Sequence, residues 1–363
     1  MELRKDCFVS EIGHGILLKI EDICLDIINL TLKDEQPSLF YPRRLKWPSV
    51  MQGQGVRSTS AEIPMVQVEF KENKPKSVKK FATMLKILKI IYTLVQEGKY
   101  CTKRDIFYQY PDLYPCQAFI DRIIDDIASM LKVPRQELHI LATSKGLVSG
   151  DLQFENSEGI FIDCQHTAIG VPIAPHSRDM QNLQTQAKFV LVVEKDATFQ
   201  KLMSHQFCKK MKTCILITGK GYPDNGTLFL LQEIYARQRL PIFVLVDADP
   251  HGIEIMAVYK FGSKNQMFDQ TLALPSVQWI GILPEEIKRC HIPDSTLCTL
   301  SPRHLQMCVH LKSRPYFQHD EYMQSQLDIL IELKKKVEIQ CLDAISSNYL
   351  SDVYLPRKLK DII

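Results

Sequence analysis

The sequence has little of what several common classes of protein require. Its eleven cysteines include no Cys-x-x-Cys pair and no zinc-ligand spacing, so we interpret them as reduced, mostly buried thiols. It has no Gly-x-x-x-x-Gly-Lys-Ser/Thr motif, so no ATP-hydrolysing P-loop is encoded. The net charge is only +3, from 45 basic and 42 acidic residues, and nucleic-acid binding would therefore depend on local basic patches.

Long hydrophobic runs are also missing. The apolar stretch at residues 16–28 is interrupted by charged side chains and does not resemble a secretory signal. The most apolar helical segment, residues 82–95, contains Lys86 and Lys89, so we do not expect it to cross a membrane. The cytosol and the nucleus remain as expected compartments.

The first half of the chain is predicted to be mainly helical. Residues 1–75 contain an amphipathic helix at 12–32 and a Pro-, Gly- and Ser-rich stretch at 33–64 that reads as a flexible linker. The apolar stripe of the helix could dock on a partner or on its own domain. In residues 76–160, three helices precede two short strands, at 138–142 and 147–154, around a turn. This order is typical of a winged-helix domain.

The second half is predicted to be an α/β domain. A connector at 161–187 leads to residues 188–363, where apolar strands alternate with helices. We expect strands at 189–193, 214–218, 242–246 and 277–282, forming a mostly parallel sheet. A long amphipathic helix at 322–344 is expected to cap that sheet.

Acidic residues follow two of the predicted strands. Glu194 comes directly after the first strand, and Asp247 and Asp249 follow the third, with Gly252 allowing a sharp entry into the next helix. The carboxyl ends of parallel strands meet at one edge of a sheet, and three carboxylates crowded there would favour Mg²⁺. An Asp-x-Asp pair by itself is a weak signal, because turn and helix-capping acids share this spacing.

A second group of residues lies on the helix predicted to begin after Thr102. Tyr108 could attack a phosphodiester and keep the phosphoryl group as a covalent ester. Arg104, one helical turn earlier, could hold the scissile phosphate. On spacing alone, the pattern favours Phe107 and Tyr108 as core aromatics of a small helix.

The longer motifs carry a family resemblance. The segments 76–82, 102–108 and 138–146 resemble the winged-helix (CAP-like) domain of the meiotic double-strand-break transesterases, eukaryotic relatives of the topoisomerase VI A subunit. The segments 192–199, 217–224 and 246–255 resemble the Toprim domain of the same family, which has a Rossmann-like parallel α/β fold. The resemblance extends from about residue 76 to the C-terminus.

The resemblance implies a role for each matching residue. Family members usually carry two tyrosines where this chain has Phe107 and Tyr108, which makes Tyr108 the implied nucleophile. Arg104 matches the basic residue beside that tyrosine. The implied Mg²⁺ ligands are Glu194, Asp247 and Asp249, and Lys145, on the wing, matches a lysine placed to meet DNA. We expect Lys103, beside Arg104, to be a further DNA contact because of its charge.

The resemblance also implies a reaction and partners. The tyrosine would attack double-stranded DNA, form a 5′-phosphotyrosyl link and so initiate homologous recombination in the nucleus, on meiotic chromosomes. The expected partners are a second copy of the chain in a homodimer, accessory break-forming proteins and a topoisomerase VI B-like (GHKL) subunit. One departure is Leu228, where the family commonly has arginine after threonine. Two alternatives stay open: a non-catalytic DNA-binding scaffold, and the A subunit of an ATP-dependent strand-passing topoisomerase.

Overall fold

The computed structural model describes residues 10–360, with gaps at 44–50, 53–54, 57–63, 112–113, 142–143, 176–179, 212, 263–272, 290–293 and 319. Contacts within the chain define two units. Unit 1 comprises residues 1–50, 58–143 and 265–269, and unit 2 comprises residues 51–57, 144–264 and 270–363. No described helix is long and apolar enough to cross a membrane.

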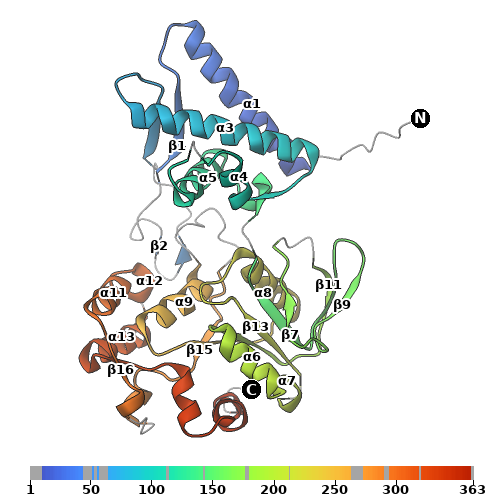
Figure 1. Cartoon of the computed structure of the whole chain (residues 1–363), viewed down its shortest axis with the longest axis vertical. Coiled ribbons are helices and arrows are strands. Elements are labelled where there is room, and N and C mark those ends of the chain that lie inside the picture. The colour runs from blue at the N-terminus through green and yellow to red at the C-terminus, as the bar shows by residue number, and fades with distance from the viewer. Residues whose placement is uncertain are drawn as a thin grey trace. The chain divides into compact units, whose positions relative to one another are not determined.

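Unit 1 is built around two long helices, α1 (Glu11–Leu32) and α3 (Pro75–Glu97), which lie side by side (Figure 1). The predicted N-terminal helix is confirmed, and it docks on its own unit through Ile16, Leu17 and Ile20. The expected linker is only partly irregular, because β1 (Ser38–Pro42) pairs antiparallel with β4 (Met65–Glu69). Helix α1 and strands β1 and β4 therefore share one core with the helices that follow.

Two shorter helices complete unit 1, as the sequence predicts: α4 (Lys103–Gln109) and α5 (Gln117–Leu131). The β-ribbon predicted after them is not formed. Instead β6 (Ile140–Leu141) pairs parallel with β5 (Cys101–Thr102), and β7 (Leu147–Gly150) joins the sheet of unit 2. The expected boundary at residue 160 therefore moves to 143/144, because backbone pairing draws β7 into the other unit.

A buried ion pair links the elements of unit 1. The Lys80 ammonium on α3 lies 2.8 Å from Asp126 Oδ2 on α5 and also donates a hydrogen bond to the Tyr41 hydroxyl on β1. The side chains of Lys80 and Asp126 are 26% and 10% exposed. Each ion is therefore largely shielded from water and depends on the other.

Replacing Lys80 with methionine should destabilise unit 1, because the Asp126 carboxylate and the Tyr41 hydroxyl would both lose their contact with this ammonium. Breaking a fully buried pair costs about 3–5 kcal/mol, and the residual exposure of Lys80 lowers our expectation to about 2 kcal/mol. The free energy of unfolding in urea measures the loss. Lys89→Met, an exposed position on the same helix, is the matched control. Equal stability of both variants would contradict the prediction.

Unit 2 is centred on a six-stranded sheet in the order β10-β7-β13-β12-β14-β15. Four neighbouring strands run parallel, which confirms the predicted mostly parallel sheet: β13 (Cys214–Thr218), β12 (Phe189–Val193), β14 (Ile242–Leu245) and β15 (Gln278–Ile280). β7 and β10 (Val171–Pro172) extend one edge in antiparallel pairing. Every residue of β12, β13 and β14 is buried, as their uninterrupted apolar runs predict.

Helices connect these strands, and smaller elements surround the sheet. The helices that link the parallel strands are α6 (Asp196–Ser204), α7 (Phe207–Lys210), α8 (Asn225–Gln238) and α9 (Pro250–Phe261). The segment expected as a connector contributes β9 (Phe161–Asp163) and β11 (Gln181–Gln184), and both pair antiparallel with β8 (Gln153–Glu155) from the preceding segment. A short hairpin pairs β2 (Met51–Gln52) with β3 (Gly55–Val56).

The C-terminal part differs from its prediction. The long helix expected at 322–344 ends early, as α13 (Glu321–Leu333), because Lys334 adopts a left-handed conformation with φ of 53°. The chain then forms β17 (Lys335–Lys336) against β16 (Cys298–Thr299). Helix α13 packs with α11 (Pro302–Lys312) and α12 (Pro315–Gln318), and α11 contacts α9 (Figure 1). Two further α-helices in the described part of unit 2 are α10 (Glu286–Arg289) and α14 (Leu355–Lys360).

Candidate functional site

Helix α4 begins at a well-defined cap. The Thr102 side chain accepts a hydrogen bond from the Asp105 backbone N–H, and the Asp105 carboxylate accepts one from the Thr102 N–H. This reciprocal pair satisfies amides that a helix start leaves free. The start of α4 is thereby fixed, and Ile106 anchors the helix in the core.

The fixed helix presents Tyr108 to solvent. Its side chain is 68% exposed, and Arg104 on the same helix is also exposed. The Phe107 ring is half-buried and packs edge-on against the Tyr108 ring, with centroids 5.5 Å apart. The core-aromatic alternative therefore holds for Phe107 and fails for Tyr108. A hydroxyl on an exposed ring can reach a large substrate without rearrangement of the core.

The two nearby tyrosines make contacts within unit 1. Tyr114 is buried, and the Tyr110 ring stands edge-on to it with centroids 6.4 Å apart. The Lys86 ammonium lies 3.1 Å from the centre of the Tyr110 ring. These contacts tie both rings to neighbouring side chains of unit 1.

Lys103 is less accessible than a DNA-contacting residue would be. Only 17% of its side chain is exposed, and its ammonium faces Asp121 and Asp125 of α5 at 3.6 and 4.0 Å. Burial lowers the pKa of Lys103, and the nearby Arg135 charge adds to this effect. The geometry gives Lys103 a structural contact, and its role in DNA binding remains a prediction.

Lys145 lies in unit 2 rather than on a wing of unit 1. It is exposed, its backbone N–H donates to the Asp224 carboxylate at 2.8 Å, and its ammonium donates to the Lys220 carbonyl at 3.1 Å. The charge of Lys145 is therefore held above the loop that leads into α8. Its DNA contact also remains a prediction.

The sheet of unit 2 brings the three predicted acids to one edge. Glu194 directly follows β12, and Asp247 and Asp249 follow the neighbouring parallel strand β14. The Asp247 backbone N–H donates to the Glu194 carboxylate at 3.0 Å, which joins the two strand ends. The Asp249 side chain accepts a hydrogen bond from the Gly252 N–H at 2.7 Å and caps α9.

Gly252 makes this turn possible through close packing. A Cβ atom at residue 252 would lie 2.4 Å from the carbonyl oxygen of Asp247. Any side chain would therefore push α9 away from the turn that carries Asp247 and Asp249. The glycine predicted from the sequence is confirmed as necessary, for close approach of the backbone.

Burial shifts the pKa values of two of the acids, Glu194 and Asp247. Burial raises the pKa of Glu194 to about 7, and the charges of Asp247 and Asp249 add to the rise. Burial also raises the pKa of Asp247, while hydrogen bonds from Lys195 and from the Ile339 N–H oppose that rise. Asp247 and Asp249 are only 4% and 8% exposed. The electrostatics therefore favour a cation at this edge.

Two lysines and a further glutamate, missed by the sequence analysis, meet these acids. The Lys195 ammonium lies 2.6 Å from Asp247 Oδ2, and the Lys336 ammonium lies 3.8 Å from Asp249 Oδ2. Glu338 pairs with both lysines, at 3.0 and 3.5 Å. Lys195 could have been suspected from its place beside Glu194, whereas Lys336 and Glu338 lie in a segment expected to be helical.

The carboxylate oxygens of the three acids suit a magnesium ion, although both oxygens of Asp247 already contact other groups of the protein. All three predicted ligands are carboxylates, the hard oxygen donors that Mg²⁺ prefers. In the described part of the chain, no three His, Cys, Asp or Glu side chains are arranged to hold a metal ion. The Asp247 oxygens are instead engaged by Lys195 and Ile339. Metal binding would require at least Lys195 to move.

The raised pKa of Glu194 predicts a pH-dependent stability. A carboxyl whose folded-state pKa is about 7, against the usual 4.5, is stabilising when protonated. This stabilisation is complete when the pH is below the pKa of the group in the unfolded chain, and it is lost as the pH rises through about 7. We expect the unfolding temperature to fall over this range, and to fall less in Glu194→Gln. Differential scanning calorimetry at several pH values checks this; identical slopes for both proteins would refute it.

Leu228, the residue that departs from the family pattern, has a structural role. The side chain lies on α8 and is completely buried, beside Thr227, which is also buried and donates to the Asp224 carboxylate at 2.9 Å. Leu228 therefore contributes to the core of unit 2, and no cation of this chain projects from that position.

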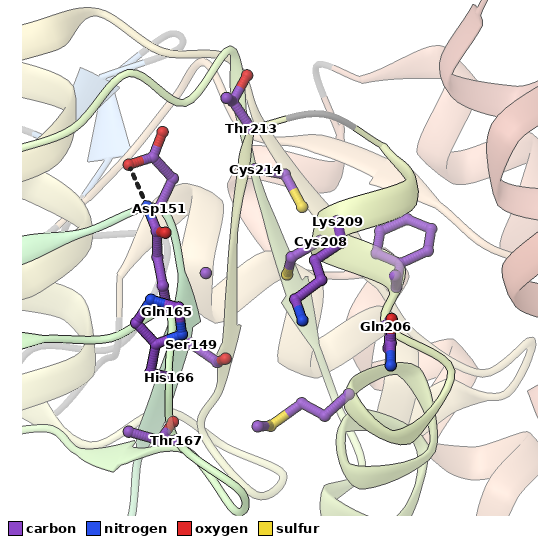
Figure 2. Close-up of a pocket in the computed structure, with 13 residues that line it drawn as sticks. Ser149, Asp151, Gln165, His166, Thr167, Gln206, Cys208, Lys209, Thr213 and Cys214 are labelled. Atoms are coloured by element: carbon purple, nitrogen blue, oxygen red, sulfur yellow. Dashed lines mark hydrogen bonds between the residues drawn. The ribbon is translucent and has the colours of Figure 1, made fainter.

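A separate pocket lies at the opposite edge of the same sheet (Figure 2). Cys214, the first residue of β13, lines it together with Asp151 and Cys208, whereas the acids follow the last residues of β12 and β14. The first residues of parallel strands lie at one end of the sheet, and their last residues lie at the other end. The pocket is therefore remote from the acid cluster.

Comparison with known proteins identifies both regions. Residues 189–359 match the family described as the Toprim domain of Spo11 and of the topoisomerase 6 A subunit, and residues 79–140 match the family described as type IIB DNA topoisomerase. The chain is 42% identical to "Meiotic recombination protein SPO11" of Mus musculus, over 95% of this chain and 87% of the relative. The Homo sapiens protein of the same name shows the same identity and coverage. The A subunit of DNA topoisomerase 6 from Arabidopsis thaliana is 34% identical over 78% of this chain and 66% of its own length.

These matches confirm the resemblance seen in the motifs. The four parallel strands of the sheet and the acids Glu194, Asp247 and Asp249 lie in the Toprim match, and Tyr108 lies in the type IIB topoisomerase match. Together the two matched regions and the relatives span most of the sequence. The chain therefore belongs to the family of Spo11 and the topoisomerase 6 A subunit.

Proposed function

We propose that this protein makes meiotic DNA double-strand breaks by a topoisomerase-like transesterification. The relatives with 42% identity are named for meiotic recombination, and family membership supports a DNA-cleaving enzyme. The observation that carries the proposal is the exposed Tyr108 on a capped helix within the type IIB topoisomerase match. An exposed phenol beside an arginine suits attack on a phosphate of a bulky duplex.

The reaction exchanges one phosphodiester for another. The Tyr108 hydroxyl oxygen attacks a backbone phosphorus, the bond from phosphorus to the 3′-oxygen breaks, and a 5′-phosphotyrosyl ester forms. The phenol loses its proton, and the departing 3′-oxygen gains one. Arg104 stays positively charged throughout, so it acts by holding the phosphate and stabilising its developing charge, and it takes no proton.

The acid cluster forms the second half of the site. Glu194, Asp247 and Asp249 would hold Mg²⁺, which when bound supplies Lewis-acid stabilisation of the phosphate and of the leaving oxygen. Asp247 and Asp249 are buried and Glu194 is half-buried, and all three follow strands at the carboxyl edge of the sheet. In the proposed enzyme the tyrosine and the acids come from opposite protomers of a homodimer, so that two hybrid sites cut both strands.

The proposed partners follow from the same assignment. Double-stranded DNA would be contacted mainly through its phosphates, by Arg104 and Lys145, with Lys103 contributing if it leaves its acidic partners. Accessory break-forming proteins and a topoisomerase VI B-like subunit would complete the assembly. The proposed location is the nucleus, on meiotic chromosomes.

Denaturing capture of DNA-linked protein tests the proposal directly. The purified protein with its partners is incubated with duplex DNA and Mg²⁺, denatured, digested and analysed by mass spectrometry. We expect a nucleotide attached to the Tyr108 peptide through a 5′-phosphate. Attachment to another residue would overturn the assignment.

Two other functions give different results in the same assembly. A strand-passing topoisomerase would relax supercoiled DNA with ATP and reseal it, whereas a scaffold would bind DNA and form no adducts. Stable 5′-adducts without relaxation favour the proposed transesterase. The exposed Tyr108 and the buried acids favour chemistry over a scaffold.

A further inference from the structure

A short C-terminal segment, residues 335–340, lies against the turn that carries the acids; we call it the strap. Val337 exchanges backbone hydrogen bonds with Ala248, at 2.9 and 3.2 Å, between the two aspartates of the turn. The Ile339 backbone N–H donates to Asp247 Oδ1 at 2.8 Å. The strap therefore holds one oxygen of Asp247 in place and leaves the other for a cation.

Lys195 binds that second oxygen and the strap at the same time. Its ammonium lies 2.6 Å from Asp247 Oδ2, and it also donates to Glu338 Oε2 and Gln340 Oε1, each at 3.0 Å. These three acceptors match the three donors of an ammonium group. Two of the three acceptors belong to the strap, so the lysine can give up Asp247 and still be held.

We propose that Lys195 competes with Mg²⁺ for Asp247, and that Glu338 and Gln340 of the strap hold the lysine when the metal takes its place. The inference rests on the proposed metal-binding role of the acids. Lys195 is a positioning residue in this scheme, since it regulates access to the acids and contacts no reacting atom. The competition would raise the Mg²⁺ concentration that break formation requires.

Charge and space support this competition. Mg²⁺ bound to Asp247 Oδ2 would sit at about 2.0–2.1 Å from that oxygen, in a demanding octahedral shell. An ammonium 2.6 Å from the same oxygen would then lie beside a divalent cation inside a largely buried cluster. Two cations that contact the same oxygen are close to one another, and like charges at close range repel strongly where water is scarce. The metal and the bound lysine therefore exclude one another at Asp247.

The second lysine does not replace the first. Lys336 lies 3.8 Å from Asp249 Oδ2 and 3.5 Å from Glu338 Oε1, both longer than the contacts of Lys195. Asp249 also already caps α9 through its other oxygen. Competition for a metal should consequently be strongest at Lys195.

Calorimetric titration of MgCl₂ into the full DNA-free protein tests the proposal without measuring cleavage. Lys195→Met keeps a chain of similar length and removes the charge, and we expect its Kd for Mg²⁺ to fall at least about fivefold. Lys195→Arg retains a cation and should show no such gain. Lys201→Met is the matched control, because Lys201 pairs with Asp343, which is not one of the three proposed metal ligands. Unchanged or weaker binding in Lys195→Met would overturn the proposal.

A double substitution tests the role of the strap. If Glu338 acts by holding the displaced lysine, Glu338→Gln should weaken Mg²⁺ binding in the wild-type background and have no effect beside Lys195→Met. An equal loss in both backgrounds would show that Glu338 attracts the metal itself, contrary to the proposal. Because Lys195→Met removes the cation beside Asp247 and could impair folding, the Mg²⁺-induced rise in unfolding temperature is measured in parallel. It should be larger in Lys195→Met than in the wild type.

The result is separable from the proposed function. Mg²⁺ binding that is lost in Asp247→Asn locates the ion at the acids, whether or not DNA is cut. If the wild type and Lys195→Met both fail to bind Mg²⁺, the competition is disproved together with the metal site. If Lys195→Met binds more tightly while no Tyr108 adduct is ever found, the competition stands and the cleavage assignment fails.

Discussion

We expect Tyr108→Phe to abolish covalent protein–DNA adducts while leaving DNA binding and the fold intact. The phenylalanine ring keeps the packing against Phe107 and removes only the attacking oxygen, from a side chain that is 68% exposed. Because no other residue of α4 has a hydroxyl group, adduct formation should fall by at least about a thousandfold. Denaturing gel analysis of end-labelled DNA measures the adducts, and a mobility-shift assay measures binding.

Tyr110→Phe provides the matched control for this experiment. Tyr110 lies two residues away, stacks edge-on with Tyr114 and faces the Lys86 ammonium through its ring. Loss of its hydroxyl keeps these ring contacts, so adducts should persist at the wild-type level. Adducts that survive Tyr108→Phe and vanish in Tyr110→Phe would move the nucleophile to residue 110.

The second large effect is expected from Asp247→Asn. The amide keeps the size of the side chain, and its oxygen can still accept the hydrogen bond from the Ile339 N–H. It loses the charge that attracts a cation beside Glu194 and Asp249. Since metal-ion stabilisation of a phosphoryl transition state is worth several kcal/mol, cleavage should fall by at least about a hundredfold. Asp352→Asn, a surface acid paired with Lys210, should cleave normally.

Mixing the two inactive variants tests whether opposite protomers build the site. In a heterodimer of Tyr108→Phe and Asp247→Asn, hybrid sites would leave one site intact and the other doubly altered. We therefore expect single-strand nicks without double-strand breaks. If tyrosine and acids act within one protomer, both sites would be damaged and no cleavage would appear. Differently tagged protomers purified in sequence provide the heterodimer.

Local patterns in the sequence predicted much of both units. The strands expected at 189–193 and 242–246 form within one residue of those bounds, because uninterrupted apolar runs can only be satisfied inside a sheet covered on both faces. The acids after these strands converge because parallel strands end at the same edge. Tyr108 was identified through its motif, while its exposure could not be read from spacing, which favoured a core aromatic.

Long-range pairing is where the predictions were wrong. Residues 147–150 read as half of a β-ribbon, yet they join β13, a strand much later in the sequence, through backbone hydrogen bonds. The helix expected to reach residue 344 stops at Leu333, because the following segment bonds to the acid turn at Ala248. Periodicity reports which face of an element is apolar, and it carries no information on which distant backbone satisfies its hydrogen bonds.

The sequence by itself determined the family, the parallel sheet, the candidate nucleophile and the three acids, because motif spacing and apolar runs are local properties. Only the tertiary structure decided that Lys195 and the strap surround Asp247, that Lys103 is paired with acids of α5, and that Lys145 belongs to unit 2. Ion pairs of this kind join residues far apart in the chain. Their partners are chosen by how the elements pack, since a charge is stabilised by whichever opposite charge folding brings within reach.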